Sequence, residues 1–196
     1  MSKDRHDRDS LVIPPHYRRL KRGPQVILPK DIGAIITYTG ISKNSICVDA
    51  GTGSGWLAVS LAKVAKTVTS YDIREEFTEI AEKNKEMEQL DNLILKKGDV
   101  TKKISEKNVD LVTLDMPSSE KALKNAHKAL KAGGYVVGYL PHFEQVSKFV
   151  DNLNKLKFTN LLTIEVIVRD ILVREQGTRP STKGIWHTAY LVFAQK

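Results

Sequence analysis

The feature that most constrains this chain is a regular alternation of short apolar runs and longer amphipathic segments. Apolar runs rich in β-branched residues occupy 45–49, 67–72 and 109–115. Segments with helical periodicity, 56–65 and 74–90, follow the first two runs. An alternation of strands and helices predicts a parallel sheet covered by helices on both faces. All-helical and all-β folds do not fit this pattern.

The C-terminal third follows a different pattern. Two apolar runs, 161–168 and 187–194, have no helix between them and flank an irregular segment that carries arginines. They predict an antiparallel pair of strands at one edge of the sheet. Helices are expected after Pro29 and over 118–134, the second closed by two glycines. The expected fold class is therefore α/β, Rossmann-like, with a mostly parallel sheet and an antiparallel C-terminal edge pair.

Length and composition indicate one domain in a reducing, cytoplasmic setting. The chain has 196 residues and a single cysteine, which suits one domain without an internal disulfide. We expect residues 1–23, polar and basic, to form an N-terminal arm and 24–196 to form the domain. No stretch reaches the roughly 18 uncharged apolar residues of a membrane span, and the N-terminus lacks a secretory signal. No cysteine and histidine cluster has metal spacing, so no metal is expected.

Positive charge is concentrated in arginine clusters. Lysine and arginine number 31 against 23 acidic residues, and eight of the nine arginines fall in two segments, 5–22 and 169–179. The planar guanidinium fork matches phosphate oxygens. The clusters therefore predict a polyanionic partner such as a nucleic acid.

A glycine-rich turn joins the first predicted strand to the first predicted helix, in the segment VDAGTGSGWL. Gly51, Gly53 and Gly55 allow a tight turn and leave room for a ligand against the backbone. A bulky residue occupies the place of the last small residue in a dinucleotide fingerprint, and the loop has no phosphate-binding lysine. The turn thus suits a ligand other than a dinucleotide or a nucleoside triphosphate.

Four predicted strands end in an acid: Asp49, Asp72, Asp99 and Asp115. Because parallel strands share one carboxyl edge, where ligands bind, these acids should converge. Asp49 suits an ammonium group, and Asp72, about twenty residues on, is placed to accept both hydroxyls of a ribose.

The glycine loop with its flanking acids resembles a class I S-adenosylmethionine-dependent methyltransferase, over about residues 41–145. The resemblance implies S-adenosylmethionine as cofactor and S-adenosylhomocysteine as product. It places the ribose at Asp72, the cofactor adenine at Asp99 and the methionine end along 54–57. The residues expected to bind the cofactor are Asp49, Gly51, Gly53, Ser54, Gly55, Trp56, Leu57, Asp72, Asp99 and Asp115.

Three further segments, LPKD (28–31), LPHFEQV (140–146) and HTAYLVFAQK (187–196), narrow the resemblance. Together with the loop they are similar to the tRNA adenine-N1 methyltransferases of bacteria and archaea. That resemblance implies methylation of a T-loop adenine, at position 57 or 58, by a homotetramer. Leu28 stands where the family often has an aromatic residue or histidine. The family's small β-rich N-terminal domain has only about 27 residues in its place here.

The chemistry of this reaction assigns a role to Asp115. Adenine N1 already carries a lone pair, so catalysis can rest on alignment and electrostatics. The product base is cationic, and the resemblance assigns its stabilisation to the acid at Asp115. N1 lies on the Watson–Crick edge, so the base must be unpaired or flipped. The residues expected to contact RNA are Arg18, Arg19, Arg22, Arg174 and Arg179.

Other readings remain open at this point. A corrin C-methyltransferase of the cobalamin pathway shares the short core, a tRNA-binding partner subunit would lack catalysis, and a protein-repair carboxyl methyltransferase shares the cofactor. The sequence leaves undecided which adenine is modified and whether a partner subunit is needed. It also leaves undecided how tRNA is held and what the change at Leu28 does.

Overall fold

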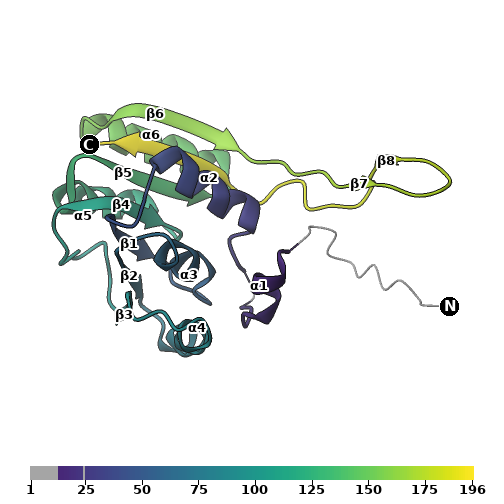
Figure 1. Cartoon of the computed structure of the whole chain (residues 1–196). Coiled ribbons are helices and arrows are strands. Elements are labelled where there is room, and N and C mark those ends of the chain that lie inside the picture. Colours follow the sequence, from purple (N-terminus) through teal and green to yellow (C-terminus); the bar gives the residue numbers. More distant parts are fainter. Residues whose placement is uncertain (1–12, 24) are drawn as a thin grey trace.

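The order of strands in the main sheet follows from the alternation along the chain. The computed structural model describes residues 13–23 and 25–196. Seven strands pair in the order β3-β2-β1-β4-β5-β9-β6 (Figure 1). Their bounds are Ile46–Ala50 (β1), Thr67–Asp72 (β2), Leu93–Lys97 (β3), Val109–Leu114 (β4), Leu130–Leu140 (β5), Thr159–Glu165 (β6) and Tyr190–Gln195 (β9).

Strands β1 to β5 run parallel, whereas β9 is antiparallel to both of its neighbours, β5 and β6. The prediction of a mostly parallel sheet with an antiparallel C-terminal edge pair is confirmed. Strand β9 begins at Tyr190 rather than at His187, because the residues before it belong to a longer connection.

Helices cover both faces of the sheet. Alternate residues of β1 point to opposite faces: Cys47 packs in the hydrophobic core on one side and Val48 in the core on the other. The first core includes residues of α2 and α3, and the second includes residues of α5 and α6. The helices are α1 (Pro15–Arg19), α2 (Pro29–Thr39), α3 (Trp56–Ala62), α4 (Glu75–Met87), the short η1 (Ser119–Ala122), α5 (Leu123–Ala129) and α6 (Phe143–Lys155). None of the described helices is both long and apolar enough to cross a membrane.

The predicted helix over 118–134 is wrong at its C-terminal end. Helix α5 ends at Ala129, and β5 begins at Leu130. The pairing of β5 with β4 shifts register between Val109 and Leu111. At this irregularity a side chain on Gly134 would approach the Val109 carbonyl oxygen to 2.8 Å. Gly133 and Gly134 therefore accommodate the irregular start of β5. In the sequence, such a glycine pair looks the same as the glycines that commonly end a helix.

The segment before α2 packs against the domain. Tyr17 of α1 is buried, and its hydroxyl lies 2.5 Å from that of Ser60. The Asn84 side chain accepts from the Lys21 amide (2.7 Å) and donates to the carbonyl oxygens of Lys21 and Ser54 (2.8 Å each). This bridge ties the segment to the glycine loop. The boundary at residue 23 stays a prediction, and Arg5 and Arg8 lie outside the described residues.

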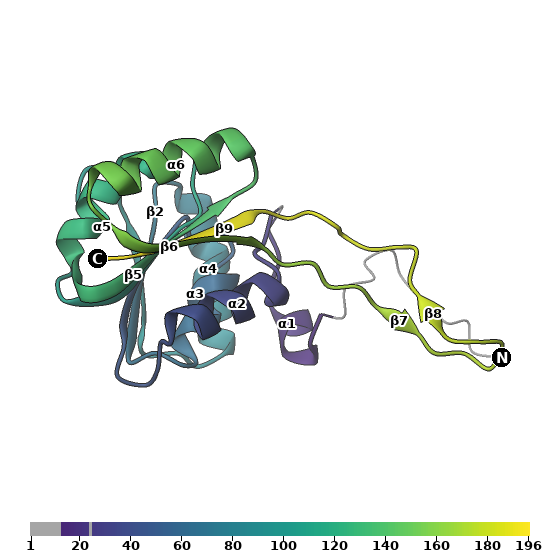
Figure 2. The same cartoon turned by 90° about the horizontal axis from the view of Figure 1, so that it is seen from above.

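Residues 166–189, between β6 and β9, form an extended arm that projects from the domain (Figures 1 and 2). Two short antiparallel strands, β7 (Ile171–Leu172) and β8 (Arg179–Pro180), pair within it. At its base, the ring nitrogens of His187 lie 2.6 Å from a Glu165 carboxylate oxygen and 2.9 Å from the Pro141 carbonyl oxygen. The sequence predicted only an irregular segment here.

Candidate active site

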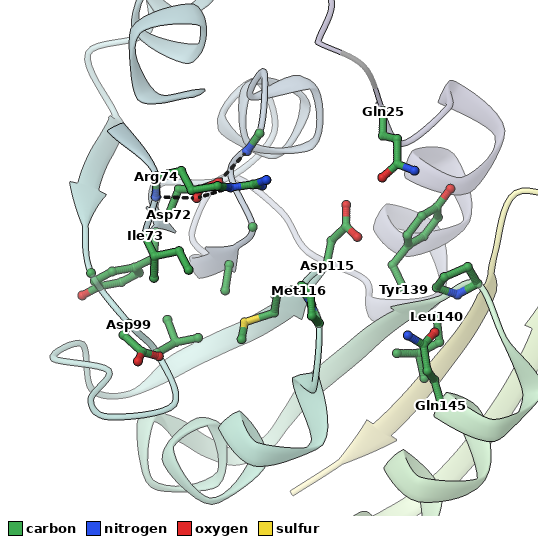
Figure 3. Close-up of a pocket in the computed structure, with 18 residues that line it drawn as sticks. Gln25, Asp72, Ile73, Arg74, Asp99, Asp115, Met116, Tyr139, Leu140 and Gln145 are labelled. Carbon is green, nitrogen blue, oxygen red and sulfur yellow. Dashed lines mark hydrogen bonds and ion pairs between the residues drawn. The ribbon is translucent and has the colours of Figure 1, made fainter. Parts of the chain in front are cut away.

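A cavity of about 630 Å³ lies beside the carboxyl ends of β1, β2, β4 and β5 (Figure 3). It brings together three of the four acids that end predicted strands: Asp72, Asp99 and Asp115. The remaining lining residues are Gln25, Ala50, Gly51, Gly53, Tyr71, Ile73, Arg74, Gly98, Val100, Met116, Pro117, Tyr139, Leu140, Pro141 and Gln145.

The glycine loop forms one wall of this cavity by packing directly on the end of β4. Gly51 has a φ of +91°, and a β-carbon there would lie 1.8 Å from the Asp115 carbonyl oxygen. The Asp115 amide in turn donates to the Ala50 carbonyl at 2.8 Å. Gly55, with a φ of +79°, precedes α3 and lies against Ala81 of α4. Only glycine combines this backbone conformation with this close approach.

Asp72 is held at the edge of the loop by backbone amides. One carboxylate oxygen accepts from the Gly53 amide at 3.0 Å. The other accepts from the Arg74 amide at 3.0 Å and lies 3.5 Å from the Arg74 Nε (Figure 3). Each carboxylate oxygen has a second lone pair, so the side chain can accept further hydrogen bonds from a ligand in the cavity.

Asp99 is the second acid of the cavity. Its carboxylate accepts from the Thr101 hydroxyl at 2.6 Å and the Thr101 amide at 2.9 Å. These hydrogen bonds hold the pKa of Asp99 below its ordinary value. Asp99 is therefore a fixed negative group, and the apolar side chains of Ile73, Val100 and Met116 line the same cavity.

Asp115 has a different environment from the other acids. No hydrogen bond from residues 13–23 or 25–196 reaches its carboxylate. Burial, followed by the charges of Asp49 and Asp72, raises its pKa to about 7, and Arg74 opposes this shift. Figure 3 shows the Asp115 carboxylate between Arg74 and the ring of Tyr139, below Gln25. A carboxyl group in a cavity whose pKa is raised by burial and by neighbouring acids is typical of a functional site.

Asp49 does not line the cavity. It is buried within the sheet, where its carboxylate accepts from the hydroxyls of Ser70 (2.6 Å) and Thr113 (2.7 Å). Burial raises its pKa, and those hydroxyls oppose the shift. The Ser70 hydroxyl also lies 2.6 Å from that of Thr52, so Asp49 is linked to the glycine loop through Ser70. A direct contact between Asp49 and a ligand stays a prediction.

The remaining loop residues surround a small adjoining cavity of about 30 Å³. Trp56 and Leu57 line it, and the Trp56 indole donates to the Lys21 carbonyl at 3.1 Å. Ser54 also lines it, and its buried hydroxyl has no hydrogen-bond partner in the described part of the chain. An unsatisfied buried hydroxyl is costly and marks a place where a polar ligand group would fit.

Sequence reasoning missed Gln25, Tyr139 and Gln145 in the cavity. Tyr139 is the last residue but one of β5 and lies at the same sheet edge as the acids, so the predicted strand end could have identified it. The sequence around Gln25 contains no such pattern, because the path of its segment depends on docking against the domain.

The arginines predicted to contact RNA lie outside the cavity. Arg18 and Arg19 are on α1, where Arg18 donates to the Ile13 carbonyl and Arg19 lies 3.4 Å from Glu88. Arg22 follows in the docked segment, and Arg174 and Arg179 are exposed on the arm. Helix α1 and the arm lie toward the same side of the molecule (Figures 1 and 2). Residues 13–23 and 25–196 contain no group of three or more acidic, histidine or cysteine side chains placed to hold a metal ion.

The sheet order, the glycine loop and the acids at the strand ends define a class I methyltransferase. More narrowly, the chain belongs to the family described as tRNA methyltransferase complex GCD14 subunit, which matches residues 17–182. This confirms the family predicted from the glycine loop and the three flanking segments.

Relatives in this family share most of the chain. It is 41% identical to the tRNA (adenine(57)-N(1)/adenine(58)-N(1))-methyltransferase TrmI of Methanocaldococcus jannaschii, over 94% of this chain and 77% of that protein. It is 32% identical to the tRNA (adenine(58)-N(1))-methyltransferase TrmI of Thermus thermophilus, over 92% of this chain and 73% of that protein.

Solved structures give the same picture of the fold. The tRNA (m1A58) methyltransferase TrmI of Aquifex aeolicus superposes with a TM-score of 0.85 at 30% identity, over 91% of this chain and 72% of that one. A precorrin 8w decarboxylase from Methanobacterium thermoautotrophicum reaches a TM-score of 0.77 at 20% identity, over 90% of this chain and 97% of that one. At that identity the second likeness shows the fold alone.

We expect Gly51→Ala to lower the free energy of unfolding by about 2–4 kcal/mol, because the new methyl group would meet the Asp115 carbonyl in a strained backbone conformation. The matched control is Gly33→Ala in α2, where a methyl group meets no atom within 4 Å. That change should stabilise by about 0.5–1 kcal/mol through helix propensity. Urea denaturation measures both, and equal stability of the two variants would contradict this packing.

Proposed function

We propose that this chain transfers a methyl group from S-adenosylmethionine to N1 of adenine 58 in the T loop of tRNA. The observation that carries the proposal is the 41% identity, over 94% of the chain, to an enzyme named for this reaction. The cavity supports it, since a glycine loop and three acids surround a space large enough for a nucleoside cofactor and a base. The tRNA substrate also favours a cytoplasmic location.

The residues of the cavity fit S-adenosylmethionine. When bound, this cofactor supplies an electrophilic methyl group on a sulfonium. Asp72 would accept the ribose hydroxyls, and Asp99 with Ile73, Val100 and Met116 would surround the cofactor adenine. The methionine end would lie along the glycine loop, where the unpartnered Ser54 hydroxyl is available. Trp56 and Leu57 would shape that end.

Asp115 would act on the target base. Adenine N1 needs no deprotonation, so the site must align the base and stabilise the positive charge that develops on it. An ionised Asp115 does both, because it can accept a hydrogen bond from the exocyclic amine and neutralise the cationic product. The target adenine must leave any pairing to present N1 inside the cavity.

The test of the proposal is methylation of an unmodified tRNA transcript with labelled S-adenosylmethionine. Mass spectrometry of the nucleosides should identify 1-methyladenosine, and a transcript with guanine at position 58 should lose that product. A transcript with adenine 57 replaced shows whether the neighbouring position is also a target. Cofactor binding without any methylation of tRNA would contradict the proposal and favour a small substrate such as a corrin.

Asp115→Asn should lower kcat at least about a hundredfold while cofactor affinity changes little. In the wild type, kcat/KM should rise as the pH rises through about 7, because the carboxyl group, with its raised pKa, must lose its proton to act. The residual activity of the variant should lack this rise. Asp91→Asn, an exposed acid at the opposite edge of the sheet, is the control. Unchanged turnover of Asp115→Asn would remove this residue from the mechanism.

The arginines on α1 and on the arm would contact phosphates. The double variant Arg174→Ala with Arg179→Ala should weaken tRNA binding and reduce the slope of log affinity against log salt by about two. Cofactor binding should be unchanged. Lys43→Ala with Lys66→Ala, two exposed lysines at the amino ends of β1 and β2, is the matched control. Equal tRNA affinities for the two double variants would contradict this role.

The arm would also assemble copies of the chain, in the homotetramer that the family resemblance implies. Apolar side chains on it are exposed: Ile167, Val168, Ile171, Val173 and Trp186. Light scattering should find a species near four times 22.0 kDa. Ile171→Asp with Val173→Asp should dissociate it, whereas Met87→Asp, on α4 outside the arm, should not. A wild-type species of 22.0 kDa alone would contradict assembly.

A further inference from the structure

Three aromatic rings, those of Phe143, Tyr190 and His187, form a continuous aromatic stack beside the cavity. The rings of Phe143 and Tyr190 lie face to face, with their centroids 4.5 Å apart and their planes at 24°. The ring of His187 lies 4.9 Å from that of Tyr190, centroid to centroid. Phe143 is the first residue of α6, Tyr190 is the first residue of β9, and His187 belongs to the base of the arm. Segments far apart along the chain therefore build this stack together.

The aromatic stack borders the cavity. In the sheet, Tyr190 pairs with Leu140. His187 lies 2.9 Å from the carbonyl oxygen of Pro141, two residues before Phe143. Leu140 and Pro141 both line the cavity. Groups that flank a ligand in the cavity therefore lie within reach of the stack.

His187 gives one end of the stack a positive charge. Its ring nitrogens lie 2.6 Å from a Glu165 carboxylate oxygen and 2.9 Å from the Pro141 carbonyl oxygen, and both of these oxygens only accept hydrogen bonds. Only the imidazolium form can donate from both nitrogens at once. The hydrogen bonds to Glu165 and Pro141 accordingly raise the pKa of His187.

Phe143, at the other end of the stack, presents a free ring face. Its side chain is 68% exposed, and one face of the ring lies against Tyr190. The His142 amide donates to the Gln145 side chain at 3.3 Å, which fixes the first turn of the helix that carries Phe143. The residues on either side of Phe143, His142 and Glu144, are polar and exposed. The ring is thus a held, isolated aromatic surface and not part of a broad apolar face.

We propose that the free face of Phe143 stacks on an unpaired base of the tRNA next to the target adenine. The inference rests on the proposed methylation of adenine 58, because a base that flips into the cavity leaves its neighbours without a stacking partner. Proteins bind such bases on aromatic side chains. One ring matches one base, whereas a stable interface with a second copy buries about 800 Å² on each partner. The charge of His187 suits a polyanion.

The experiment measures binding of a T-arm stem-loop RNA to the full chain in the presence of S-adenosylhomocysteine. Phe143→Ala should weaken binding about tenfold, because a base loses its stacking partner. Phe143→Trp should bind at least as tightly as the wild type. Phe143→Leu should bind nearly as weakly as Phe143→Ala, because leucine keeps apolar area but has no ring. Cofactor affinity should be the same in all three variants.

Tyr38→Ala is the matched control. Tyr38 lies near the C-terminal end of α2, is 53% exposed and also packs on an aromatic ring, that of Phe193, at 5.4 Å between centroids. It lines neither the cavity nor the aromatic stack, so its loss should leave RNA binding unchanged.

Stem-loops with an abasic site on one side or the other of adenine 58 identify the stacked base. Removal of that base should weaken binding to the wild type, and Phe143→Ala should then add no further loss. Unchanged RNA binding by Phe143→Ala, or additive losses with every abasic stem-loop, would overturn the inference. So would a smaller assembly of Phe143→Ala in light scattering, because Phe143 would then contact a second copy. Failure of the wild type to methylate adenine 58 would instead contradict the proposed function, since binding is measured without turnover.

Discussion

The site depends on the close packing of the Gly51 backbone against the end of β4. With no room for a β-carbon between Gly51 and the Asp115 carbonyl, the first and fourth strands approach each other at their carboxyl ends. The Gly51 amide also bonds the Tyr71 carbonyl at the end of β2. One backbone turn thus brings three strand ends together, and Asp72, which ends β2, and Asp115, which follows β4, line one cavity. The asparagine bridge from Asn84 to Ser54 holds the other end of the same turn.

Two acids near this turn, Asp49 and Asp115, differ in the hydrogen bonds that their carboxylates accept. Asp49 has two hydroxyl donors, so its hydrogen bonds are satisfied inside the sheet. Asp115 has no such donor among the described residues, and burial with two neighbouring acids raises its pKa to about 7. Arg74 offsets part of the cost of keeping Asp115 ionised, and a cation or an amine in the cavity would reduce that cost further. This difference, rather than the shared residue type, makes Asp115 the better candidate for acting on a base.

The parts of the fold that the sequence predicted are those set by local periodicity and by the geometry of parallel sheets. Acids at the ends of parallel strands must meet at one edge of the sheet, so the sequence alone predicts that Asp72, Asp99 and Asp115 lie close together. The error at Gly133 and Gly134 has a physical cause, because glycines that end a helix and glycines that permit an irregular strand are alike in sequence. The position of Gln25 depends on how its segment docks against the domain, and the partners of Lys30, Val166 and Thr188, lie more than 130 positions away along the chain. No local pattern contains that information.

The ion pair of Lys30 and Asp31 is hard to explain by stability alone. A buried pair of charges costs desolvation energy that an apolar pair of similar size does not, and replacing such pairs is often neutral or stabilising. What apolar side chains cannot do is impose a direction on hydroxyl protons. Here Lys30 donates to Asp31, to the Val166 carbonyl and to the Thr188 hydroxyl, and Thr188 donates to Asp31, so the pair fixes the direction of the Thr188 proton at the base of the arm.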